Sequence, residues 1–287
     1  MEESIKLAII GGSGLYNMDG LKSTKEYMPE TPFGLPSAPI IVGTLEGQRV
    51  AFLARHGLGH HLMPTEVPYR ANIYALKSLG VERLVSISAC GSLREDYSPG
   101  HIVIPDQLYD NTKDRPRTFF GDGLVAHVGV ANPFCGELSQ QLEGAARAVN
   151  ATVHSGGTLI TIEGPRFSTK AESNTYRAWG ISIIGMTAAP EAFLAREAEM
   201  CYAVMAHVTD YDVWHVYETP VTVEMVVQTL NKNTAIAQES IRHLVRHLKG
   251  ERACECDHAL ADAIITQRKS IPEETRKKLD LLIKKYI

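Results

Sequence analysis

The sequence predicts an α/β fold in which a mixed central β-sheet is flanked by helices. Short apolar runs, typical of buried strands, alternate along the chain with segments of helical periodicity. Such an alternation places helices on both faces of a sheet. The chain has 287 residues, which is enough to bury a substantial core.

The individual elements follow from their apolar patterns and from the turn residues between them. Apolar runs predict strands over residues 6–10, 40–45, 49–53, 83–88, 101–104, 158–162, 181–184 and 202–208. The turn-forming triplet Glu46-Gly47-Gln48 makes the second and third of these runs a hairpin. Helical spacing predicts helices over residues 71–79, 137–149, 169–179, 192–199 and 221–248.

The C-terminal end differs from the rest of the chain. The alternating pattern weakens from Lys249, and Pro272 precedes a final amphipathic helix over residues 273–286. We therefore expect one domain over residues 1–248. We expect residues 249–287 to be a helical extension that packs on this domain or at a subunit interface.

Composition and charge exclude several classes of partner. The hydrophobic share of 44% and charged share of 22% are those of a soluble globular protein. The net charge is −4 and the basic residues are scattered, which argues against nucleic-acid binding. Neither a membrane-spanning run nor a signal peptide is evident. Five widely spaced cysteines fit a reducing compartment, so a cytoplasmic location is expected.

Ligands of open α/β sheets bind where the strands end, and five predicted strand ends carry polar loops at residues 11–14, 54–57, 88–92, 185–187 and 209–212. The first, Gly11-Gly12-Ser13-Gly14, offers backbone N–H groups to an anion. It lacks the Gly-Lys-Ser/Thr of a P-loop and the third glycine of a dinucleotide fingerprint. A tight structural turn is the alternative interpretation.

Basic side chains of the second loop provide partners for the same anion. The guanidinium of Arg55 suits bidentate phosphate binding, and His56 could add a donor. A surface ion pair is the alternative for this Arg-His pair. His60 and His61 have no carboxylate or thiolate at ligand spacing, so we expect no metal.

Asp210 and Asp212 are two residues apart at the end of a predicted buried strand. If the extended conformation persists, both carboxylates point the same way, and their proximity and burial raise one pKa towards neutrality. The alternative is a helix N-cap or a solvated turn. Thr187 and Ser88 would add hydroxyl donors at this edge, although each type is also common in caps and turns.

Six segments of the chain together resemble the 5′-methylthioadenosine phosphorylases. The likeness extends from about residue 6 to residue 248, and its segments are residues 9–15, 54–57, 89–93, 162–168, 185–187 and 209–212. It implies a purine-nucleoside-phosphorylase fold, a trimer or dimer of trimers, and no metal or organic cofactor. Inorganic phosphate would be a co-substrate, held by Ser13, Arg55, His56, Ser88, Ala89 (through its backbone) and Thr187.

The resemblance also implies how a nucleoside is held. Asp210 would protonate N7 of the leaving purine while Asp212 accepts from its 6-amino group. The remaining contacts would come from Phe167 and Ser168 at the base, Met186 at the ribose, and Val223, Val226 and His127 at the 5′ end. His127 is expected from a neighbouring subunit.

The expected reaction is the reversible phosphorolysis of 5′-methylthioadenosine in purine and methionine salvage, with some cleavage of adenosine. A 6-oxopurine phosphorylase, acting on inosine, guanosine or methylthioinosine, is the alternative; such relatives usually carry Glu at the Ser168 position and Asn at the Asp210 position. A different kind of function is also possible from the sequence: a nucleotide-binding dehydrogenase, or a binding module without catalytic activity. The dehydrogenase lacks its third glycine, and a silent module would be expected to have lost Arg55 or the aspartates.

The cysteine pattern leaves several pairings open. Cys254 and Cys256 could form a CxC disulfide of the kind seen in some thermophilic relatives, or remain two free surface thiols. A pairing of Cys135 with Cys201 across the fold is a further alternative, and the sequence does not decide this. Cys90 is expected to be packed rather than reactive.

Overall fold

The computed structural model of the whole chain describes residues 5–15, 18–215, 222–248 and 250–287. The side chains of Ser13 and of residues 225–232 lie outside this description. Within the described part, no helix combines the length and the apolar character that crossing a bilayer requires.

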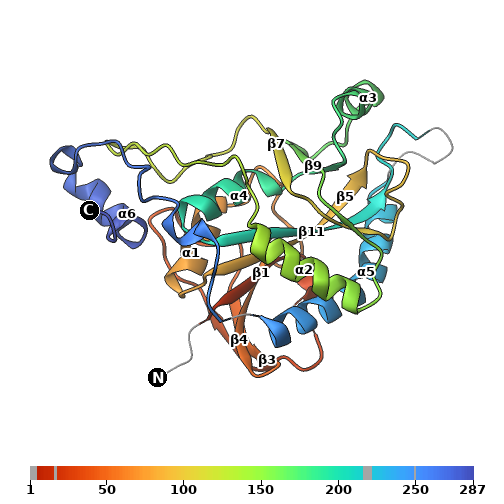
Figure 1. Cartoon of the computed structure of the whole chain (residues 1–287), viewed down its shortest axis with the longest axis horizontal. Coiled ribbons are helices and arrows are strands. Elements are labelled where there is room, and N and C mark those ends of the chain that lie inside the picture. The colour runs from red at the N-terminus through yellow and green to blue at the C-terminus, as the bar shows by residue number, and fades with distance from the viewer. Residues whose placement is uncertain (1–4, 16–17, 216–221, 249) are drawn as a thin grey trace.

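One mixed sheet of eleven strands forms the centre of the described chain (Figure 1). The strands are β1 (Leu7–Gly11), β2 (Lys22–Tyr27), β3 (Ile40–Leu45), β4 (Gln48–Ala54), β5 (Arg83–Ser92), β6 (Ile102–Ile104), β7 (Gln107–Asn111), β8 (Val153–Ser155), β9 (Thr158–Ile162), β10 (Ile183–Gly185) and β11 (Cys201–Asp210). They follow the order β2-β3-β4-β1-β5-β10-β9-β7, with β11 beside β5, β6 beside β11 and β8 beside β6. The prediction of a mixed sheet is confirmed.

Four strands run in the same direction and end at the same edge of the sheet. β4 and β5 pair in parallel with β1, and β11 pairs in parallel with β5. β10 is antiparallel to β5 and meets its last residues, with Ile184 opposite Gly91. The carboxyl ends of these parallel strands therefore gather in one region, as the sequence predicts for a ligand site.

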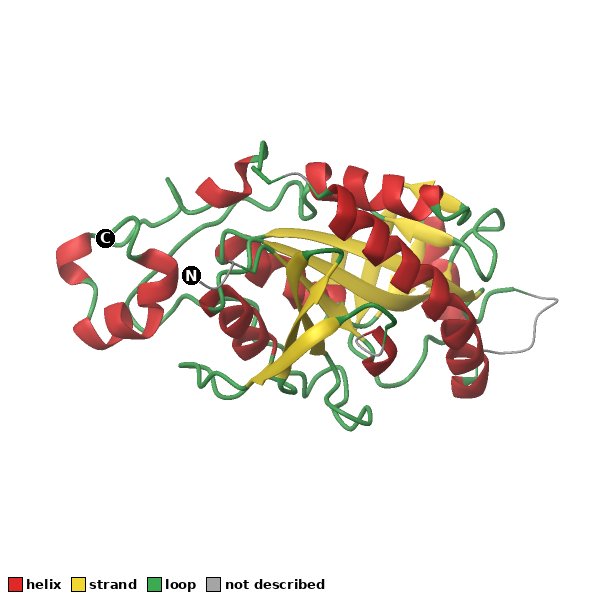
Figure 2. Ribbon diagram, turned by 90° about the horizontal axis from the view of Figure 1, so that it is seen from below, coloured by secondary structure: helices red, strands yellow, loops and turns green. Residues whose placement is uncertain are grey.

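Helices cover both faces of the sheet (Figure 2). They are α1 (Tyr69–Ser78), α2 (Gly136–Ala148), α3 (Lys170–Ala178), α4 (Ala188–Glu197), α5 (Val223–His247) and α6 (Glu273–Ile283). The pair α1 and α4 packs on one face, and the pair α2 and α5 on the other. Because side chains alternate along a strand, β1 serves both layers: Leu7 and Ile9 join the α2/α5 core, while Ala8 and Ile10 join the α1/α4 core.

The C-terminal extension beyond Lys249 carries two short 3₁₀ turns, Glu255–His258 and Arg268–Ser270, before α6. The α6 side chains of Leu279 and Ile283 belong to the same apolar core as α1 and α4. The extension also pairs with the segment before α2, through the isolated bridge between Ala126 and Ile264. It lies at one end of the molecule in Figure 1, where long loops run alongside it.

Three strands have no counterpart in the sequence-based prediction. β2 is exposed along almost its whole length, with the sequence Lys-Ser-Thr-Lys-Glu-Tyr, and β7 and β8 are short edge strands. Edge strands need bury neither face, so they carry little apolar periodicity for a sequence pattern to detect. In contrast, the predicted hairpin between β3 and β4 is present, and its turn residues Glu46 and Gly47 both have positive φ, as a tight two-residue hairpin turn requires.

Candidate active site

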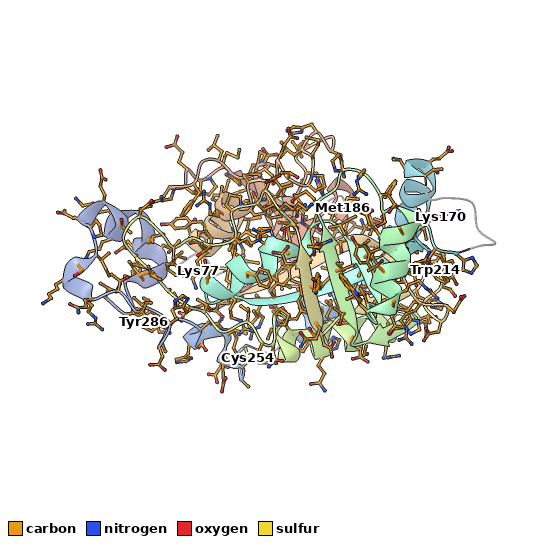
Figure 3. The ribbon with its side chains drawn as sticks, turned by 90° about the horizontal axis from the view of Figure 1, so that it is seen from above. Lys77, Lys170, Met186, Trp214, Cys254 and Tyr286 are labelled. Atoms are coloured by element: carbon orange, nitrogen blue, oxygen red, sulfur yellow. The ribbon has the colours of Figure 1, made fainter. Side chains whose placement is uncertain are left out.

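A cavity of about 530 Å³ opens where the parallel strands end. Most of the residues that the sequence predicts for the site line it together: Arg55, His56, Ser88, Ala89, Phe167, Ser168, Met186, Thr187, Asp210, Asp212 and Val223. The two aspartates and the phosphate-type residues therefore share one space. Figure 3 shows Met186, which directly follows β10 (Ile183–Gly185), well away from Cys254 and Tyr286 in the extension.

Arg55 lies just beyond β4 and is almost completely buried, with 2% of its surface exposed. Its Nε and Nη2 atoms donate to the two carboxylate oxygens of Glu191 in α4, at 2.8 and 2.9 Å. Nη2 also donates to Ser86 Oγ at 2.6 Å, and Tyr202 donates to Glu191 at 2.8 Å. The alternative of a surface ion pair for Arg55 is thereby wrong, since the pair is internal.

Charge and hydrogen bonding at Arg55 keep its guanidinium ionised. Burial on its own lowers the pKa of Arg55, but the Glu191 carboxylate outweighs burial and raises that pKa above its usual value. Among described residues, Nη1 donates only to the carbonyl of Ile87, at 3.3 Å. One of its two N–H groups is thus available to an anion in the cavity.

His56 is a neutral imidazole in the free protein. Burial and the neighbouring Arg55 charge lower its pKa to about 4. Its Nδ1 lies 2.9 Å from the carbonyl oxygen of Leu62, and its ring stacks on His60 with centroids 4.4 Å apart. Since a carbonyl only accepts, Nδ1 carries the proton and Nε2 is an acceptor until a second proton binds.

The glycine-rich loop combines a tight turn with open backbone. A side chain at Gly11 would place its Cβ 2.5 Å from Leu15, so the turn demands glycine there. Gly12 has no heavy atom near its Cβ position, and Gly12 and Gly14 both line the cavity. Both interpretations of this loop therefore hold at different residues: structural at Gly11 and open to a ligand at Gly12.

Ser88, Ala89 and Thr187 complete the half of the cavity around Arg55. Ser88 and Ala89 belong to β5, which continues to Ser92 rather than ending at residue 88 as expected. Thr187 is the N-cap residue of α4, yet its side chain makes no capping hydrogen bond. Its hydroxyl is consequently not committed to the helix end that it precedes.

Asp210 is the last residue of β11 and its carboxylate is held by two local hydrogen bonds. Thr209 Oγ1 donates to Oδ2 at 2.6 Å, and the backbone N–H of Asp212 donates to Oδ1 at 2.8 Å. Burial raises the pKa of Asp210 to about 6, although both hydrogen bonds oppose the shift; the Asp212 charge adds a smaller increase. Desolvation, more than the nearby Asp212 carboxylate, therefore brings the pKa of Asp210 close to neutral pH.

Asp212 reaches the cavity by a turn and not by continued strand alternation. Its φ is +51°, so the extended conformation assumed from the sequence ends at Asp210. Burial raises its pKa as well. The hydroxyls of Ser173 and Ser168 lie close enough to counteract part of this shift, although neither closes a hydrogen bond of normal geometry. The solvated-turn alternative is wrong, because both aspartates are buried.

The segment that carries Phe167 and Ser168 is fixed at both ends. After Ser168, a capping box starts α3: Thr169 Oγ1 accepts from the backbone of Glu172, and the Glu172 carboxylate accepts from the backbone of Thr169. Before it, the buried Arg115 pairs with Glu163 at 2.8 Å. Arg115 also donates to the carbonyl of Met186 at 2.7 Å, so one guanidinium ties together two walls of the cavity.

Three predicted site residues do not contribute described side chains to this cavity. His127 is exposed, its N–H donates to the carbonyl of Ala263, and it does not line the cavity of its own chain. The side chains of Ser13 and Val226 lie outside the described part of the structure. Val223 lines the cavity at its mouth and is 68% exposed.

Sequence reasoning missed several supporting groups. The site is supported by buried hydrogen bonds from Glu191, Tyr202 and Arg115. The only sequence signal for Glu191 was a single acidic residue within the apolar run Ala-Ala-Pro-Glu-Ala-Phe-Leu-Ala. His207 and Asn233 also line the cavity and keep side-chain nitrogens without partners among described residues. Such buried donors are suited to ligand contact.

Comparison with known proteins assigns this chain to a family. The sequence model of the Phosphorylase superfamily matches residues 6–246. The S-methyl-5′-thioadenosine phosphorylase of Geobacter sulfurreducens is 54% identical over 282 residues, covering 98% of this chain and 99% of the relative. That of Chloroflexus aurantiacus is 54% identical over 284 residues, covering 99% of each chain.

Solved structures agree. A methylthioadenosine phosphorylase from an antarctic soil metagenomic library superposes with a TM-score of 0.94 at 48% identity, covering 98% of this chain and all of the other. A methylthioadenosine phosphorylase from Schistosoma mansoni in complex with adenine gives 0.84 at 37% identity, covering 90% and 96%. The chain therefore belongs to the Phosphorylase superfamily and, within it, to the S-methyl-5′-thioadenosine phosphorylase family.

Proposed function

We propose that this enzyme catalyses the reversible phosphorolysis of 5′-methylthioadenosine, giving adenine and 5-methylthioribose 1-phosphate. The observation that carries the proposal is that Arg55 and Asp210 open into one cavity large enough for a nucleoside and phosphate. Relatives about half identical over nearly the whole chain bear the name of this activity. A solved variant of the Schistosoma mansoni enzyme holds methylthioadenosine itself.

Phosphate is proposed to lie between the glycine-rich loop and Arg55, with Ser13, Ser88, Thr187 and the backbone of Ala89 as further donors. The free N–H of Nη1 supports the role of Arg55. His56 Nε2 accepts from the protonated oxygen of monohydrogen phosphate, or donates once the anion has raised its pKa. Water exclusion around the guanidinium strengthens each of these contacts.

The bond between C1′ and N9 breaks early, and its electron pair moves into the purine. Asp210, protonated in part near neutral pH, donates its proton to N7. A phosphate oxygen stabilises the positive charge developing at C1′ and then forms the new C1′–O bond. The phosphate ester releases its proton to solvent, and Asp210 is reprotonated for the next turnover. In this scheme proximity and leaving-group protonation supply the catalysis, and none of its steps calls for a protein nucleophile, a metal or an organic cofactor.

Recognition of the 6-amino group is assigned to Asp212. An ionised carboxylate only accepts hydrogen bonds, so it attracts an amino group and opposes the carbonyl of a 6-oxopurine. Ser168 and Phe167 border the base, and Met186 lies against the ribose. The comparisons do not favour the 6-oxopurine alternative, since the relatives reported above all act on methylthioadenosine by name.

An assembly of three subunits, or two such trimers, is proposed to complete the 5′ end. Val125 and Val130 lie within three residues of the exposed His127, and the backbone N–H of Ile265 donates to the carbonyl of Val125; all three apolar side chains are exposed, which suits a subunit interface. His127 of a neighbouring subunit would then join Val223 and Val226 around the methylthio group. A cytoplasmic location, with roles in purine and methionine salvage, completes the proposal.

Initial rates with three nucleosides test the assignment. Without phosphate, no purine is released; with phosphate, methylthioadenosine has the highest kcat/KM, adenosine is about 10²-fold lower and inosine is lowest. Arg55→Lys raises the KM for phosphate, whereas the control Arg147→Lys at an exposed helix position does not. Inosine as best substrate, or purine release without phosphate, would refute the proposal.

A further inference from the structure

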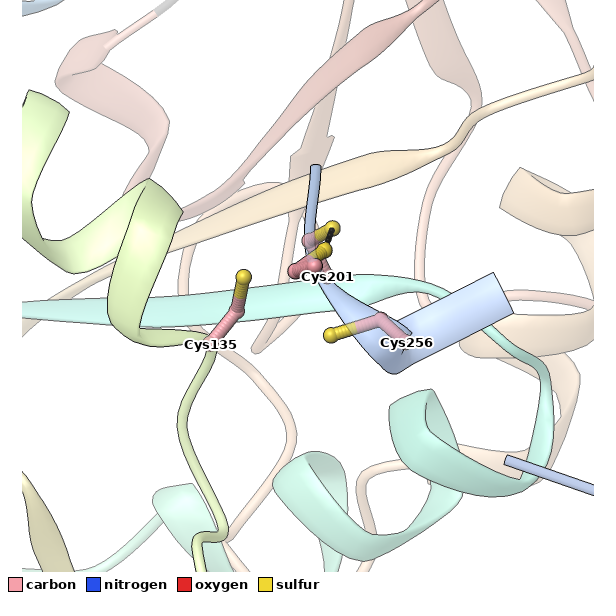
Figure 4. A group of neighbouring side chains, drawn as sticks. Cys135, Cys201 and Cys256 are labelled. Carbon is pink, nitrogen blue, oxygen red and sulfur yellow. Dashed lines mark hydrogen bonds between the residues drawn. The ribbon is translucent and has the colours of Figure 1, made fainter. Parts of the chain in front are cut away.

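Four of the five cysteines converge at one point, far from the active site in the fold. The sulfurs of Cys135, Cys201, Cys254 and Cys256 all lie within 4.8 Å of one another. They come from three separate parts of the chain: the residue before α2, the start of β11, and the beginning of the C-terminal extension (Figure 4). All are free thiols, and only Cys254 is partly exposed.

We propose that Cys135, Cys201, Cys254 and Cys256 form a structural tetrathiolate site for Zn²⁺ that fastens the C-terminal extension to the phosphorylase domain. Tetrahedral zinc with Zn–S bonds of about 2.3 Å separates its sulfurs by about 3.8 Å. The observed cluster already has this size, with Cys201 and Cys254 sulfurs 3.3 Å apart. On binding, the metal displaces the thiol protons to solvent, and no redox partner is required.

Two arginines compensate the charge of such a site. Four thiolates around Zn²⁺ leave a net charge of −2, which is costly to bury without partners. Arg196 Nη1 lies 3.5 Å from the sulfur of Cys256, and Arg252 interacts with the sulfur of Cys201. These guanidinium groups act as the outer hydrogen-bond donors that orient and stabilise thiolate ligands.

Disulfides explain this arrangement less well. A disulfide needs two sulfurs about 2.0 Å apart and makes no demand on a second pair nearby. Here every sulfur is close to the other three. The pairings left open by the sequence, Cys254–Cys256 and Cys135–Cys201, are not formed. Cys254 and Cys256 are both free thiols, but Cys256 is buried, so the expected surface position is wrong for that residue.

The position of the cluster makes its role structural. Cys201 is the first residue of β11 and Asp210 is the last, so the proposed metal and the proposed proton donor lie about 30 Å apart along one strand. Four protein ligands leave zinc no open position for a substrate. A metal that binds the native chain and not the unfolded chain stabilises the native state. It would therefore stabilise the attachment of the extension without taking part in the reaction.

Metal content is the primary measurement. Protein expressed with zinc in the medium, purified in reductant without chelator, is expected to hold about one zinc ion per chain, with four sulfur neighbours at about 2.3 Å by X-ray absorption. The proposal is overturned if the reduced protein holds no zinc and titrates five free thiols, or if it contains two disulfides by mass under non-reducing conditions.

Paired variants separate metal binding from disulfide formation and from misfolding. Cys254→Ser removes a ligand and should abolish stoichiometric zinc, whereas Cys254→His keeps a ligand and should retain it. Neither variant can form the Cys254–Cys256 disulfide, so a difference in their zinc content reflects the ligand at position 254. Cys90→Ala, outside the cluster, is the control and keeps its zinc. Zinc retained in Cys254→Ser, or lost equally in Cys254→His, would contradict the assignment.

A stability readout checks the proposed fastening. Zinc removal by chelator should lower the thermal midpoint of the wild-type protein and expose residues 250–287 to limited proteolysis. The Cys254→Ser protein should show the same protease sensitivity with or without chelator. If chelator leaves the cleavage pattern of wild-type protein unchanged, the metal does not anchor the extension.

Discussion

Arg55 and Glu191 form a bidentate ion pair, with nitrogen–oxygen distances of 2.8 and 2.9 Å, inside the wall of the active-site cavity. The two side chains are 2% and 1% exposed. The pair fixes the plane of the guanidinium and leaves one N–H of Nη1 for the anion. The orientation of Arg55, the cation proposed to bind phosphate, therefore depends on Glu191.

Replacing Glu191 by Gln should impair both stability and phosphate binding. It leaves the buried Arg55 charge uncompensated, at a cost of about 3 kcal/mol in the free energy of unfolding. The guanidinium also loses its fixed plane, so the KM for phosphate should rise at least about tenfold while the KM for the nucleoside changes little. Urea unfolding and initial rates measure the two effects.

Glu143→Gln is the matched control, since its pair with Arg147 is on the surface. It should cost less than about 0.5 kcal/mol and leave both KM values unchanged. Equal stability of the Glu191→Gln and Glu143→Gln proteins would show that the buried pair does not hold Arg55.

Asp210→Asn should lower kcat by about 10²-fold or more, because an amide cannot transfer a proton to the purine. As the proposed proton donor, wild-type Asp210 must be protonated, and burial raises its pKa to about 6. The protonated fraction therefore falls as pH rises above about 6, and kcat/KM should decline about tenfold per pH unit there. The variant should lose this alkaline limb. A limb that persists in Asp210→Asn would assign the proton to another group.

Asp212→Asn should weaken the preference for 6-aminopurines. The amide both donates and accepts, so it no longer opposes a 6-oxo group. We expect kcat/KM for methylthioadenosine to fall and the ratio of inosine to methylthioadenosine to rise at least about tenfold. Parallel assays of purine release from the two nucleosides give this ratio. An unchanged ratio would mean that Asp212 does not read the 6-position.

Gly91→Ala should displace the side chains of Asp210 and Asp212, because Gly91 lies directly beside both. Gly91 pairs with Asp210, and an added Cβ would lie 3.0 Å from Asp210 Oδ1 and 3.3 Å from Asp212 Cβ. The carboxylate must shift, and kcat should fall at least about tenfold. Steady-state kinetics with methylthioadenosine measure this loss.

Gly144→Ala serves as control for that substitution. Gly144 is exposed in α2 with open space at its Cβ position, so alanine should stabilise the protein by about 0.5–1 kcal/mol at unchanged kcat. If Gly91→Ala also kept its kcat, the reaction would not depend on the exact position of the Asp210 carboxylate.

The sequence predicts the sheet core well because its strands are buried runs with clear boundaries. β1, β9 and β11 appear within a few residues of their predicted ranges, and the loops that follow β1, β4, β5 and β11 meet as expected. β2, β7 and β8 escape prediction because short or polar edge strands carry little apolar pattern. The predicted division into a domain over residues 1–248 and an extension over 249–287 stays a prediction.

The site could be predicted where chemistry resides in short motifs and not where it depends on long-range packing. Asp210 and Arg55 are visible as strand-end residues. Glu191 is 136 residues from Arg55, and only the fold brings them together. The same holds for the cysteine cluster, whose members span residues 135 to 256. Sequence spacing cannot reveal a contact made by tertiary packing.

A crystal structure with phosphate and a non-cleavable methylthioadenosine analogue tests the central claim most directly. The account predicts one cavity in which Arg55 Nη1 lies about 3 Å from a phosphate oxygen and the Asp210 carboxyl lies about 3 Å from purine N7. Phosphate bound away from Arg55, or a purine whose N7 is turned from Asp210, would contradict it.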